Sequence, residues 1–80
     1  MIVFEKKNTR AAAYDGDTLI GMCEFDETDG VWIIQHTEVD QAYSGQGIPR
    51  RMVLLIAEEA KKAGVEVRSV CTYARKVLGH

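Results

Sequence analysis

The 80-residue sequence contains little proline and little cysteine, and both shortages restrict what the chain could be. Pro49 is the single proline, and no stretch has the composition of a linker that would divide the chain into domains. Cys23 and Cys71 are far apart, and only two histidines accompany them, so no zinc-site or Cys-x-x-Cys spacing is present. We therefore expect one domain over residues 1–80, no metal site, and free thiols of the kind typical of cytoplasmic proteins.

The sequence also lacks a strong charge of either sign and any long apolar segment. Ten basic and twelve acidic residues give a formal net charge of -2, and the basic residues occur in scattered pairs, so we expect no nucleic-acid binding. No segment approaches the roughly 20 apolar residues of a membrane span, and the N-terminus shows no signal-peptide pattern. With 46% hydrophobic and 28% charged residues, the composition is that of a soluble globular protein with one modest core.

Turn residues and β-branched residues in the first half of the chain predict an antiparallel meander. Four strands are expected there, at Ile2–Glu5, Ala11–Tyr14, Leu19–Phe25 and Val31–Val39. Residues 6–8, 15–17 and 28–30 are rich in Asn, Asp, Gly and Lys and are interpreted as the turns. Cys23 and Trp32 are expected to lie in the core.

The second half of the chain predicts a β-α-β unit and a short final helix. Apolar residues recur at helical spacing within Pro49–Ala63, at Met52, Val53, Ile56, Ala60 and Ala63. Gly64 is a suitable C-terminal cap, and Val65–Cys71 is expected to return as a strand parallel to the fourth. A helix over Tyr73–Leu78 closes the chain. The expected fold class is α+β, with a mixed sheet and helix on one face.

The loop between the fourth predicted strand and the long helix, residues 43–51, has the pattern of an anion-binding loop. Gly45 and Gly47 let the backbone turn sharply and approach a ligand without Cβ atoms in the way. The following helix would present unpaired N–H groups and the positive end of its dipole at the same place. Phosphate is the ligand that such an arrangement favours, although glycine turns also join strands to helices where no ligand binds.

The residues on either side of this loop make the prediction more specific. His36-Thr37-Glu38-Val39 precedes the loop, and Cys71-Thr72-Tyr73-Ala74 follows the helix. Over residues 8–78 the chain resembles a minimal GNAT (general N-acetyltransferase), a superfamily whose loop of pattern Q/R-x-x-G-x-G/A holds the pyrophosphate of acetyl-CoA. The resemblance implies a cofactor site at Val39, Ser44, Gly45, Gln46, Gly47, Ile48, Pro49, Arg50, Arg51 and Lys76.

Two residues depart from the superfamily pattern. Ser44 stands where the pattern has Gln or Arg, and Pro49 stands where it has Gly or Ala. Proline has no N–H, so one backbone donor to the pyrophosphate is missing, yet proline is well tolerated in the first turn of a helix. Arg50 and Arg51 could offset the missing donor, because guanidinium groups pair well with phosphate.

The resemblance also implies where the chemistry would occur. In the superfamily the pantetheine arm bonds to the edge of the fourth strand where it diverges from the fifth, which here corresponds to the backbone of residues 38–40. Strand alternation puts His36 and Glu38 on one face, where either could accept a proton from an amine, His36 being favoured. The alternative is a strand-end histidine bonded to backbone and a solvated carboxylate.

The candidate set is completed by three residues at the end of the fifth predicted strand and in the last helix. Cys71 is a candidate nucleophile that would carry the acetyl group, a thiol beside the coenzyme sulfur, or a packing residue. Tyr73 is a candidate general acid toward the leaving thiolate, or an amphipathic residue with its ring in the core. Lys76, with Arg75, could reach the 3′-phosphate, or form a solvated charged face.

The sequence therefore predicts an acetyl-CoA-dependent N-acetyltransferase acting on a primary amine that the sequence does not identify. A non-catalytic module that binds coenzyme A or its acyl esters, and a protein-interaction domain whose glycine loop is merely structural, are the alternatives. The chain could act as a monomer or as a homodimer.

Overall fold

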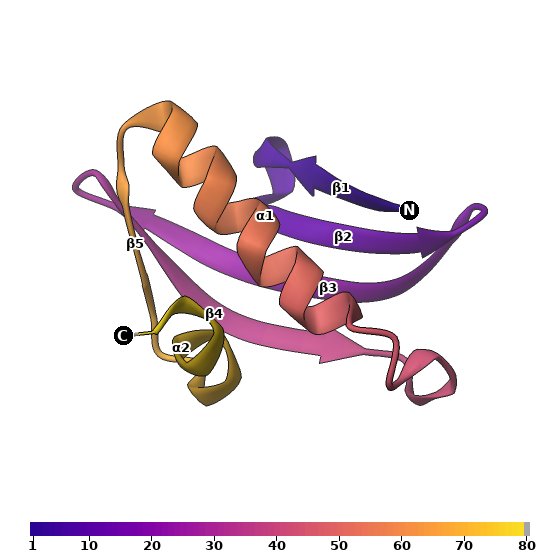
Figure 1. Cartoon of the computed structure of the whole chain (residues 1–80). Coiled ribbons are helices and arrows are strands. Elements are labelled where there is room, and N and C mark those ends of the chain that lie inside the picture. Colours follow the sequence, from indigo (N-terminus) through magenta and orange to yellow (C-terminus); the bar gives the residue numbers. More distant parts are fainter. Residues whose placement is uncertain (80) are drawn as a thin grey trace.

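The computed structural model describes residues 1–79 and contains one five-stranded sheet with two helices. The strands follow one another across the sheet in chain order, as Figure 1 shows. They are β1 (Ile2–Glu5), β2 (Arg10–Asp15), β3 (Thr18–Thr28), β4 (Val31–Val39) and β5 (Glu66–Ser69). The helices are α1 (Ile48–Ala63) and α2 (Thr72–Leu78), and two short 3-10 helices are η1 (Lys6–Asn8) and η2 (Gln41–Tyr43).

The predicted α+β fold with a mixed sheet is confirmed. β1 to β4 pair as antiparallel neighbours, and β5 pairs with β4 in parallel, with Val31 opposite Glu66 and Ile34 opposite Ser69. A parallel pair needs a crossover connection, and α1 supplies it. The antiparallel meander and the β-α-β unit thus occur in the predicted order.

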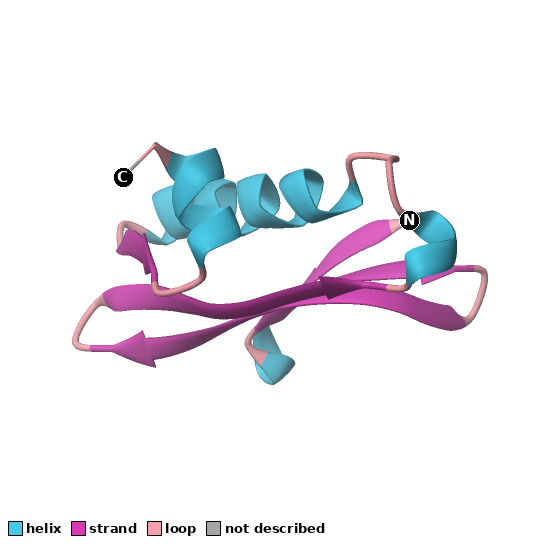
Figure 2. Cartoon of the chain, turned by 90° about the horizontal axis from the view of Figure 1, so that it is seen from below, coloured by secondary structure: helices cyan, strands magenta, loops and turns pink. Residues whose placement is uncertain are grey.

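Both helices cover the same face of the sheet, whereas η1 projects from the other face (Figure 2). α1 packs on the sheet through the apolar spacing that the sequence shows, and its buried residues are Ile48, Met52, Val53, Ile56 and Ala60. Ala63, predicted to belong to this apolar face, is exposed, because the helix has by then run past the edge of the core. Within the described residues no helix has the length and apolar character needed to cross a membrane.

The core lies between α1 and the sheet and is anchored by an aromatic cluster. Trp32 is 4% exposed and stacks on Phe25 at 4.7 Å and on Phe4 at 5.7 Å between ring centroids. Offset aromatic contacts of this kind add to the free energy gained from burying the rings. Trp32 and Cys23 are both buried, so their predicted places in the core are confirmed.

Several boundaries differ from the predicted ones. β2 extends beyond Ala11–Tyr14 because Arg10 and Asp15 also pair with β3. β3 extends beyond Leu19–Phe25 because the β3–β4 hairpin continues its ladder through polar residues as far as Thr28 opposite Val31. β5 is shorter than predicted: it stops at Ser69, so Cys71 is not a strand residue. η2 was not predicted, although Asp40 caps it through a bond from Ala42 N to Asp40 Oδ1 of 2.9 Å.

An irregularity in β4 has the greatest effect on the candidate site. Glu24 pairs with His36 and Phe25 pairs with Ile34, so Gln35 is an extra residue on β4 with no partner on β3. Such a β-bulge shifts the alternation of side chains by one residue. Upstream of the bulge Ile34 faces the helices; downstream of it Thr37 faces them.

Candidate functional site

The candidate site lies where β4 and β5 separate. Their pairing ends at Ile34 and Ser69, and Val70 N donates the last bond to Ile34 O at 3.0 Å. The chain then turns away into α2, while β4 continues to Val39 without a β5 partner. We call the space between residues 35–39 of β4 and residues 70–72 the β4–β5 gap.

The backbone of β4 presents alternate residues to this gap. Asp40 N donates to Ile20 O of β3 at 2.7 Å, so Asp40 is directed toward β3 and its N–H is already used. Because backbone groups alternate in direction along a strand, Glu38 also faces β3, whereas Thr37 and Val39 face the gap. The prediction that residues 38–40 all offer backbone groups is therefore wrong for Glu38 and Asp40, and only Val39 of that set faces the gap.

Cys71 borders the gap as the residue that caps the N-terminus of α2, and it is half-buried. Ser69 fixes its backbone: Cys71 N donates to Ser69 Oγ at 2.9 Å, and Ser69 Oγ donates to Cys71 O at 2.8 Å. The Cys71 sulfur lies 3.8 Å from Thr37 Oγ1.

The surroundings of this sulfur favour the thiolate. Burial alone would raise the pKa of Cys71, but hydrogen bonds from the backbone of Ala74, from the Thr37 side chain and from the backbone of Tyr73 and Thr37 more than offset it, so the pKa is lowered. A thiolate is the nucleophilic and acyl-accepting form of cysteine. Cys71 therefore packs against the core at its edge and is also hydrogen-bonded in a way that favours the thiolate.

Cys23 shows the opposite behaviour. Its side chain is fully buried in the core, and burial raises the pKa of its thiol to about 11. The Cys23 sulfur lies 3.3 Å from Thr37 Oγ1. Cys23 therefore remains a neutral thiol near physiological pH.

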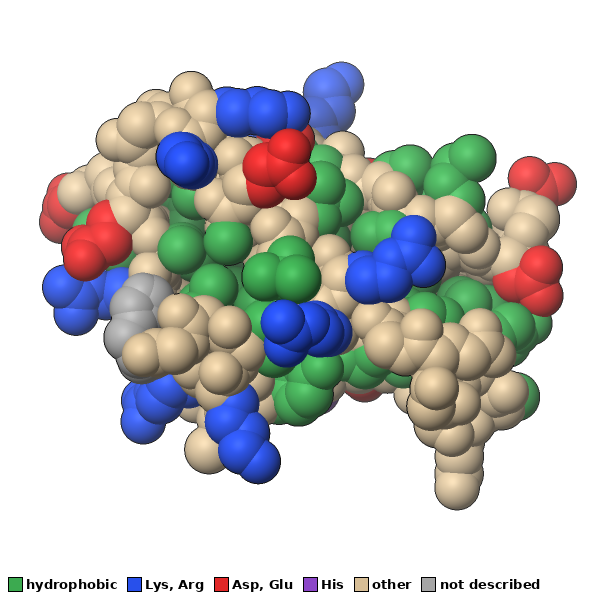
Figure 3. All heavy atoms as spheres, viewed as in Figure 1, with side chains coloured by type: hydrophobic (Ala, Val, Ile, Leu, Met, Phe, Trp, Pro, Cys, Tyr) green, Lys and Arg blue, Asp and Glu red, His purple; other side chains and the backbone are tan. Residues whose placement is uncertain are grey.

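His36 and Glu38 share a face, as predicted, but it is the face opposite the helices. His36 Nε2 lies 3.0 Å from Glu38 Oε2, and the two side chains are 55% and 62% exposed. The helix-covered face drawn in Figure 3 shows no histidine side chain. Because the bulge at Gln35 reverses the alternation, this pair and the Cys71 thiol lie on different sides of β4.

The glycine loop has the geometry expected of an anion-binding turn. Gly45 and Gly47 have φ angles of +78° and +73°, which residues with a Cβ rarely adopt. No atom lies within 4 Å of the position of a Cβ at either glycine, so the space in front of the loop is open. Gly47 caps α1, and Arg51 N makes a helical bond to Gly47 O at 3.1 Å. The N–H groups of Ile48 and Arg50 precede that bond and have no intrahelical partner.

The other predicted cofactor residues differ in what they present. Pro49 lies in the first turn of α1, as expected. The Ile48 side chain is buried in the core, so only its backbone could meet a ligand. Ser44 and Gln46 are exposed, and Ser44 N–H donates to Gln41 O at 3.1 Å, which closes η2. Arg51 borders a depression on the β1 side of α1, together with Ile2, Leu54, Leu55 and Glu58.

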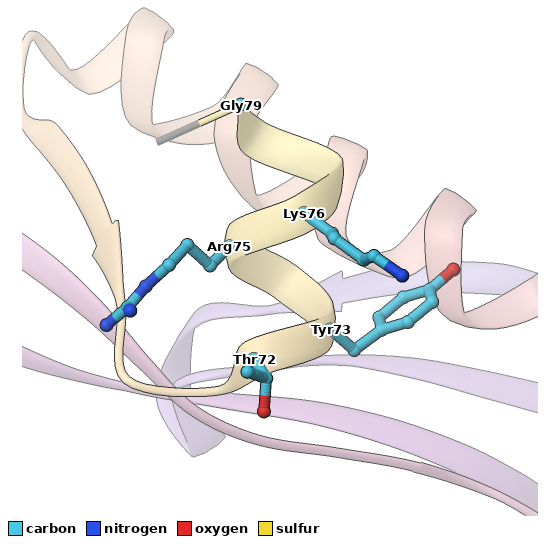
Figure 4. A pocket seen from close by; sticks show the side chains of 5 residues that line it. All are labelled: Thr72, Tyr73, Arg75, Lys76 and Gly79. Atoms are coloured by element: carbon cyan, nitrogen blue, oxygen red, sulfur yellow. The ribbon is translucent and has the colours of Figure 1, made fainter.

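Tyr73 and Lys76 extend from one side of α2, and Arg75 extends from the other (Figure 4). Arg75 Nη2 reaches back to Ser69 O at 3.4 Å. Tyr73 is 41% exposed, so it is not a core residue. In Figure 3 hydrophobic and basic side chains occupy the surface between α2 and the N-terminal half of α1. This surface suits a ligand with an apolar arm and phosphate groups.

Thr37 is the residue that sequence reasoning missed. Regular alternation from the buried Trp32 and Ile34 would direct Thr37 away from the helices, and no residue near Gln35 signals a bulge. In the structure Thr37 stands between Cys23 and Cys71 and contacts both sulfurs. No group of three or more His, Cys, Asp or Glu residues within 1–79 is arranged to hold a metal ion.

Solved structures share this fold at low sequence identity. A GCN5-related N-acetyltransferase from Sphaerobacter thermophilus superposes with a TM-score of 0.72 at 24% identity, over 81% of this chain and 22% of that chain. The PaiA N-acetyltransferase of Thermoplasma acidophilum, solved in complex with coenzyme A, gives 0.65 at 21% identity, over 70% of this chain and 35% of that one. A GCN5-like putative N-acetyltransferase from Staphylococcus aureus gives 0.73 at 18% identity, over 99% and 78%.

These likenesses establish the fold, and this chain spans only 22% and 35% of the length of the first two proteins. No curated protein matches the sequence. The model of the GCN5-related N-acetyl-transferase family matches residues 10–80, which include the glycine loop, the β4–β5 gap and Cys71. The chain belongs to the GCN5-related N-acetyltransferase family.

Proposed function

We propose that this protein binds acetyl-CoA and transfers its acetyl group to a primary amine. The observation that carries the proposal is the β4–β5 gap: an unpaired strand edge and a thiol with a lowered pKa lie beside α1, whose N-terminus follows two glycines with open space in front. Family membership supports the same reading. The N-terminus of α1 suits the pyrophosphate of the coenzyme, the strand edge suits its pantetheine arm, and the thiol suits its thioester.

The coenzyme would bind along the helix-covered face. Its pyrophosphate would accept bonds from the N–H groups of Ile48 and Arg50, where the helix dipole also favours negative charge. Its pantetheine arm would pair with the edge of β4 at Val39 and at the Thr37 carbonyl, since the Thr37 N–H already bonds to the Cys71 sulfur, as a strand does when it extends a sheet. Lys76 and Arg50 would supply positive charge to the phosphates. This path leads the thioester to the Cys71 sulfur.

Cys71 would then act as the acetyl carrier. Its thiolate attacks the thioester carbonyl carbon, a new carbon–sulfur bond forms, and the bond to the coenzyme sulfur breaks. The coenzyme leaves as a thiolate, and Tyr73, on the side of α2 shared with Lys76, is the group proposed to protonate it. The amine next attacks acetyl-Cys71, and the Cys71 thiolate is released as the amide forms.

His36 and Glu38 would act on the amine acceptor. The pair is exposed on the uncovered face of the sheet, so an acceptor could approach from that side while the coenzyme occupies the other. The His36 imidazole would take the proton that the attacking amine loses, and Glu38, 3.0 Å away, would orient the ring. The two reactants would thus meet at β4 from opposite faces.

The binding half of the proposal is tested by calorimetric titration with acetyl-CoA. Gly47→Ala places a methyl group in the open space before the loop, and Gly16→Ala is the matched control, since Gly16 also has a positive φ and no atom near its Cβ position. Both changes should cost similar stability, but only Gly47→Ala should weaken acetyl-CoA binding, by about tenfold. Equal affinities for the two variants would contradict the placement of the pyrophosphate.

The catalytic half is tested by incubating the protein with acetyl-CoA and analysing it by mass spectrometry. We expect one added acetyl group on the peptide containing Cys71, removed on addition of an amine acceptor. A folded Cys71→Ala protein should lose both the adduct and the release of free coenzyme thiol. Binding without thiol release for any amine would favour a non-catalytic coenzyme A module, and unchanged turnover in Cys71→Ala would exclude the covalent route.

A further inference from the structure

The proposed nucleophile Cys71 belongs to a cluster of three side chains from three different segments. Thr37 of β4 lies between Cys23 of β3 and Cys71 at the start of α2. Its Oγ1 is 3.3 Å from the Cys23 sulfur and 3.8 Å from the Cys71 sulfur. Thr37 and Cys23 are directly paired across β3 and β4, so the contact is held by the sheet itself.

The hydroxyl of Thr37 can give only one proton to a hydrogen bond, but it can also accept one. While Cys71 is a neutral thiol, its S–H donates to Thr37 Oγ1, and the Thr37 hydroxyl proton is directed to Cys23. Once Cys71 has lost its proton, the same hydroxyl must donate to the thiolate. Its oxygen is then free to accept from the Cys23 S–H.

Cys23 can donate this hydrogen bond because its thiol keeps its proton. Full burial raises the pKa of its thiol to about 11, so it remains a donor at the pH where Cys71 ionises. When a hydroxyl accepts one hydrogen bond, the hydrogen bond that it donates becomes stronger. The two hydrogen bonds then run in one direction: the Cys23 S–H donates to Thr37 Oγ1, and the Thr37 O–H donates to the Cys71 thiolate.

We propose that Thr37 is a positioning residue that holds the Cys71 sulfur as a thiolate at the β4–β5 gap, and that Cys23 fixes the direction of the Thr37 hydroxyl. The proposal deepens the proposed function and rests on it for its catalytic meaning. The state of the Cys71 sulfur can nevertheless be measured without acetyl-CoA, so the two proposals fail separately.

Other titratable groups lie on the elements around this sulfur. They are the side chains of Cys23, His36, Glu38, Tyr73, Arg75 and Lys76. His36 and Glu38 are directed to the opposite face of β4, and Arg75 bonds to Ser69 O. β5 contributes the uncharged Ser69, and α1 contributes the apolar side chains of the core. Tyr73 and Lys76 are retained in every variant below, so they act equally on all of them.

The test is the pH dependence of alkylation by iodoacetamide, with the modified residue identified by peptide mass spectrometry. In the folded protein Cys71 should react and the buried Cys23 should not. Thr37→Val keeps the shape and the backbone N–H of residue 37 but removes the hydroxyl. It should slow the alkylation of Cys71 near neutral pH by about tenfold and shift the profile to higher pH, because a hydrogen bond to a charged group is lost.

Matched variants separate this effect from a loss of structure. Thr37→Ser retains the hydroxyl and should react like the unmodified protein, whereas Thr37→Ala should react like Thr37→Val. Cys23→Ala should slow alkylation by about two- to threefold, and Cys23→Ser should not slow it. Thr28→Val, at an exposed position of β3, is the control for an isosteric change in the sheet. Circular dichroism of each variant reports folding.

An unchanged alkylation profile in folded Thr37→Val and Thr37→Ala would overturn the proposal. An unchanged profile in Cys23→Ala alone would overturn the part assigned to Cys23. A shifted profile in a protein that shows no acetyl-CoA turnover would leave the positioning role of Thr37 established while the proposed function fails.

Discussion

Gly21 of β3 lies directly against Val39 of β4, at the end of the strand edge proposed to receive the coenzyme. A Cβ at Gly21 would be 3.0 Å from Val39 Cγ2 and 3.1 Å from Glu38 O. The second contact is with backbone, which cannot rotate away as a side chain can. The absence of a side chain at Gly21 therefore lets β3 and β4 pair closely where Val39 faces the β4–β5 gap.

Gly21→Ala should destabilise the protein for this reason. We expect a loss of about 1–3 kcal/mol in the free energy of unfolding, because an added methyl group in a packed site forces its neighbours to move. Urea denaturation measures it. The double variant Gly21→Ala, Val39→Ala should recover only part of the loss, since the contact with Glu38 O remains. A Gly21→Ala protein as stable as the original would contradict the close approach.

Pro49 offers a gain-of-function prediction. It lies in the first turn of α1, where every other residue type would add a backbone N–H near the proposed pyrophosphate. Pro49→Ala should tighten acetyl-CoA binding by up to about tenfold, the effect of one further hydrogen bond to a charged group. Calorimetric titration measures the change, and Ala57→Gly, farther along α1, controls for altered helix stability. Unchanged affinity in Pro49→Ala would mean that the added donor does not face the ligand.

The prediction of the fold from the sequence succeeded where side chains determine the backbone. The helical spacing of Met52, Val53, Ile56 and Ala60 identified α1, and the glycines and aspartates of the turns identified the meander. Gly45 and Gly47 adopt positive φ angles, as their positions in a sharp loop suggested. In each case a particular residue type is nearly required by the local conformation.

The prediction failed where geometry depends on partners distant in sequence. Nothing about Gln35 distinguishes a bulged residue from a paired one, because the bulge reflects how β3 and β4 align. As a consequence, His36 could not be assigned to the uncovered face, nor Thr37 to the side of Cys71. β5 ends early for a related reason: its pairing depends on β4, whose edge departs after Ile34.

The His36–Glu38 pair gives a prediction that separates the two half-reactions. Because the pair lies across β4 from the Cys71 thiol, His36→Asn should leave acetyl-CoA affinity and acetylation of Cys71 unchanged. Transfer from acetyl-Cys71 to the amine should fall by about a hundredfold, the usual contribution of a general base. Acetyl-Cys71 should therefore accumulate in this variant and be visible by mass spectrometry.

Two further variants sharpen that experiment. Glu38→Gln should slow the amine step less than His36→Asn, since Glu38 acts through the ring it orients. Asp26→Asn, at an exposed position of β3 that pairs with Ile33, should have no effect. If His36→Asn transferred acetyl to the amine at the original rate, the amine would lose its proton elsewhere, and the uncovered face would have no catalytic role.

Glu5 makes the stability of the β1–β2 hairpin depend on pH. Its carboxylate accepts bonds from Tyr14 Oη at 2.5 Å and Arg10 Nε at 2.7 Å, and these, with a bond from Asn8, lower the pKa of Glu5 below its ordinary value of 4.5. A lowered pKa in the folded state stabilises the fold above the ordinary value, and this stabilisation disappears as the pH falls through the folded-state pKa.

Tyr14→Phe removes the largest of these bonds and should change that pH dependence. Near neutral pH the variant should unfold at lower urea than the original protein, because Glu5 is ionised and has lost a donor. In acid, below the lowered pKa of Glu5, its carboxylate takes up a proton and the difference between the two proteins should narrow. Tyr73→Phe, which removes an exposed hydroxyl on α2, should show no such narrowing. A Tyr14→Phe protein whose deficit was the same at both pH values would mean that the Tyr14 hydroxyl does not preferentially stabilise the ionised form of Glu5.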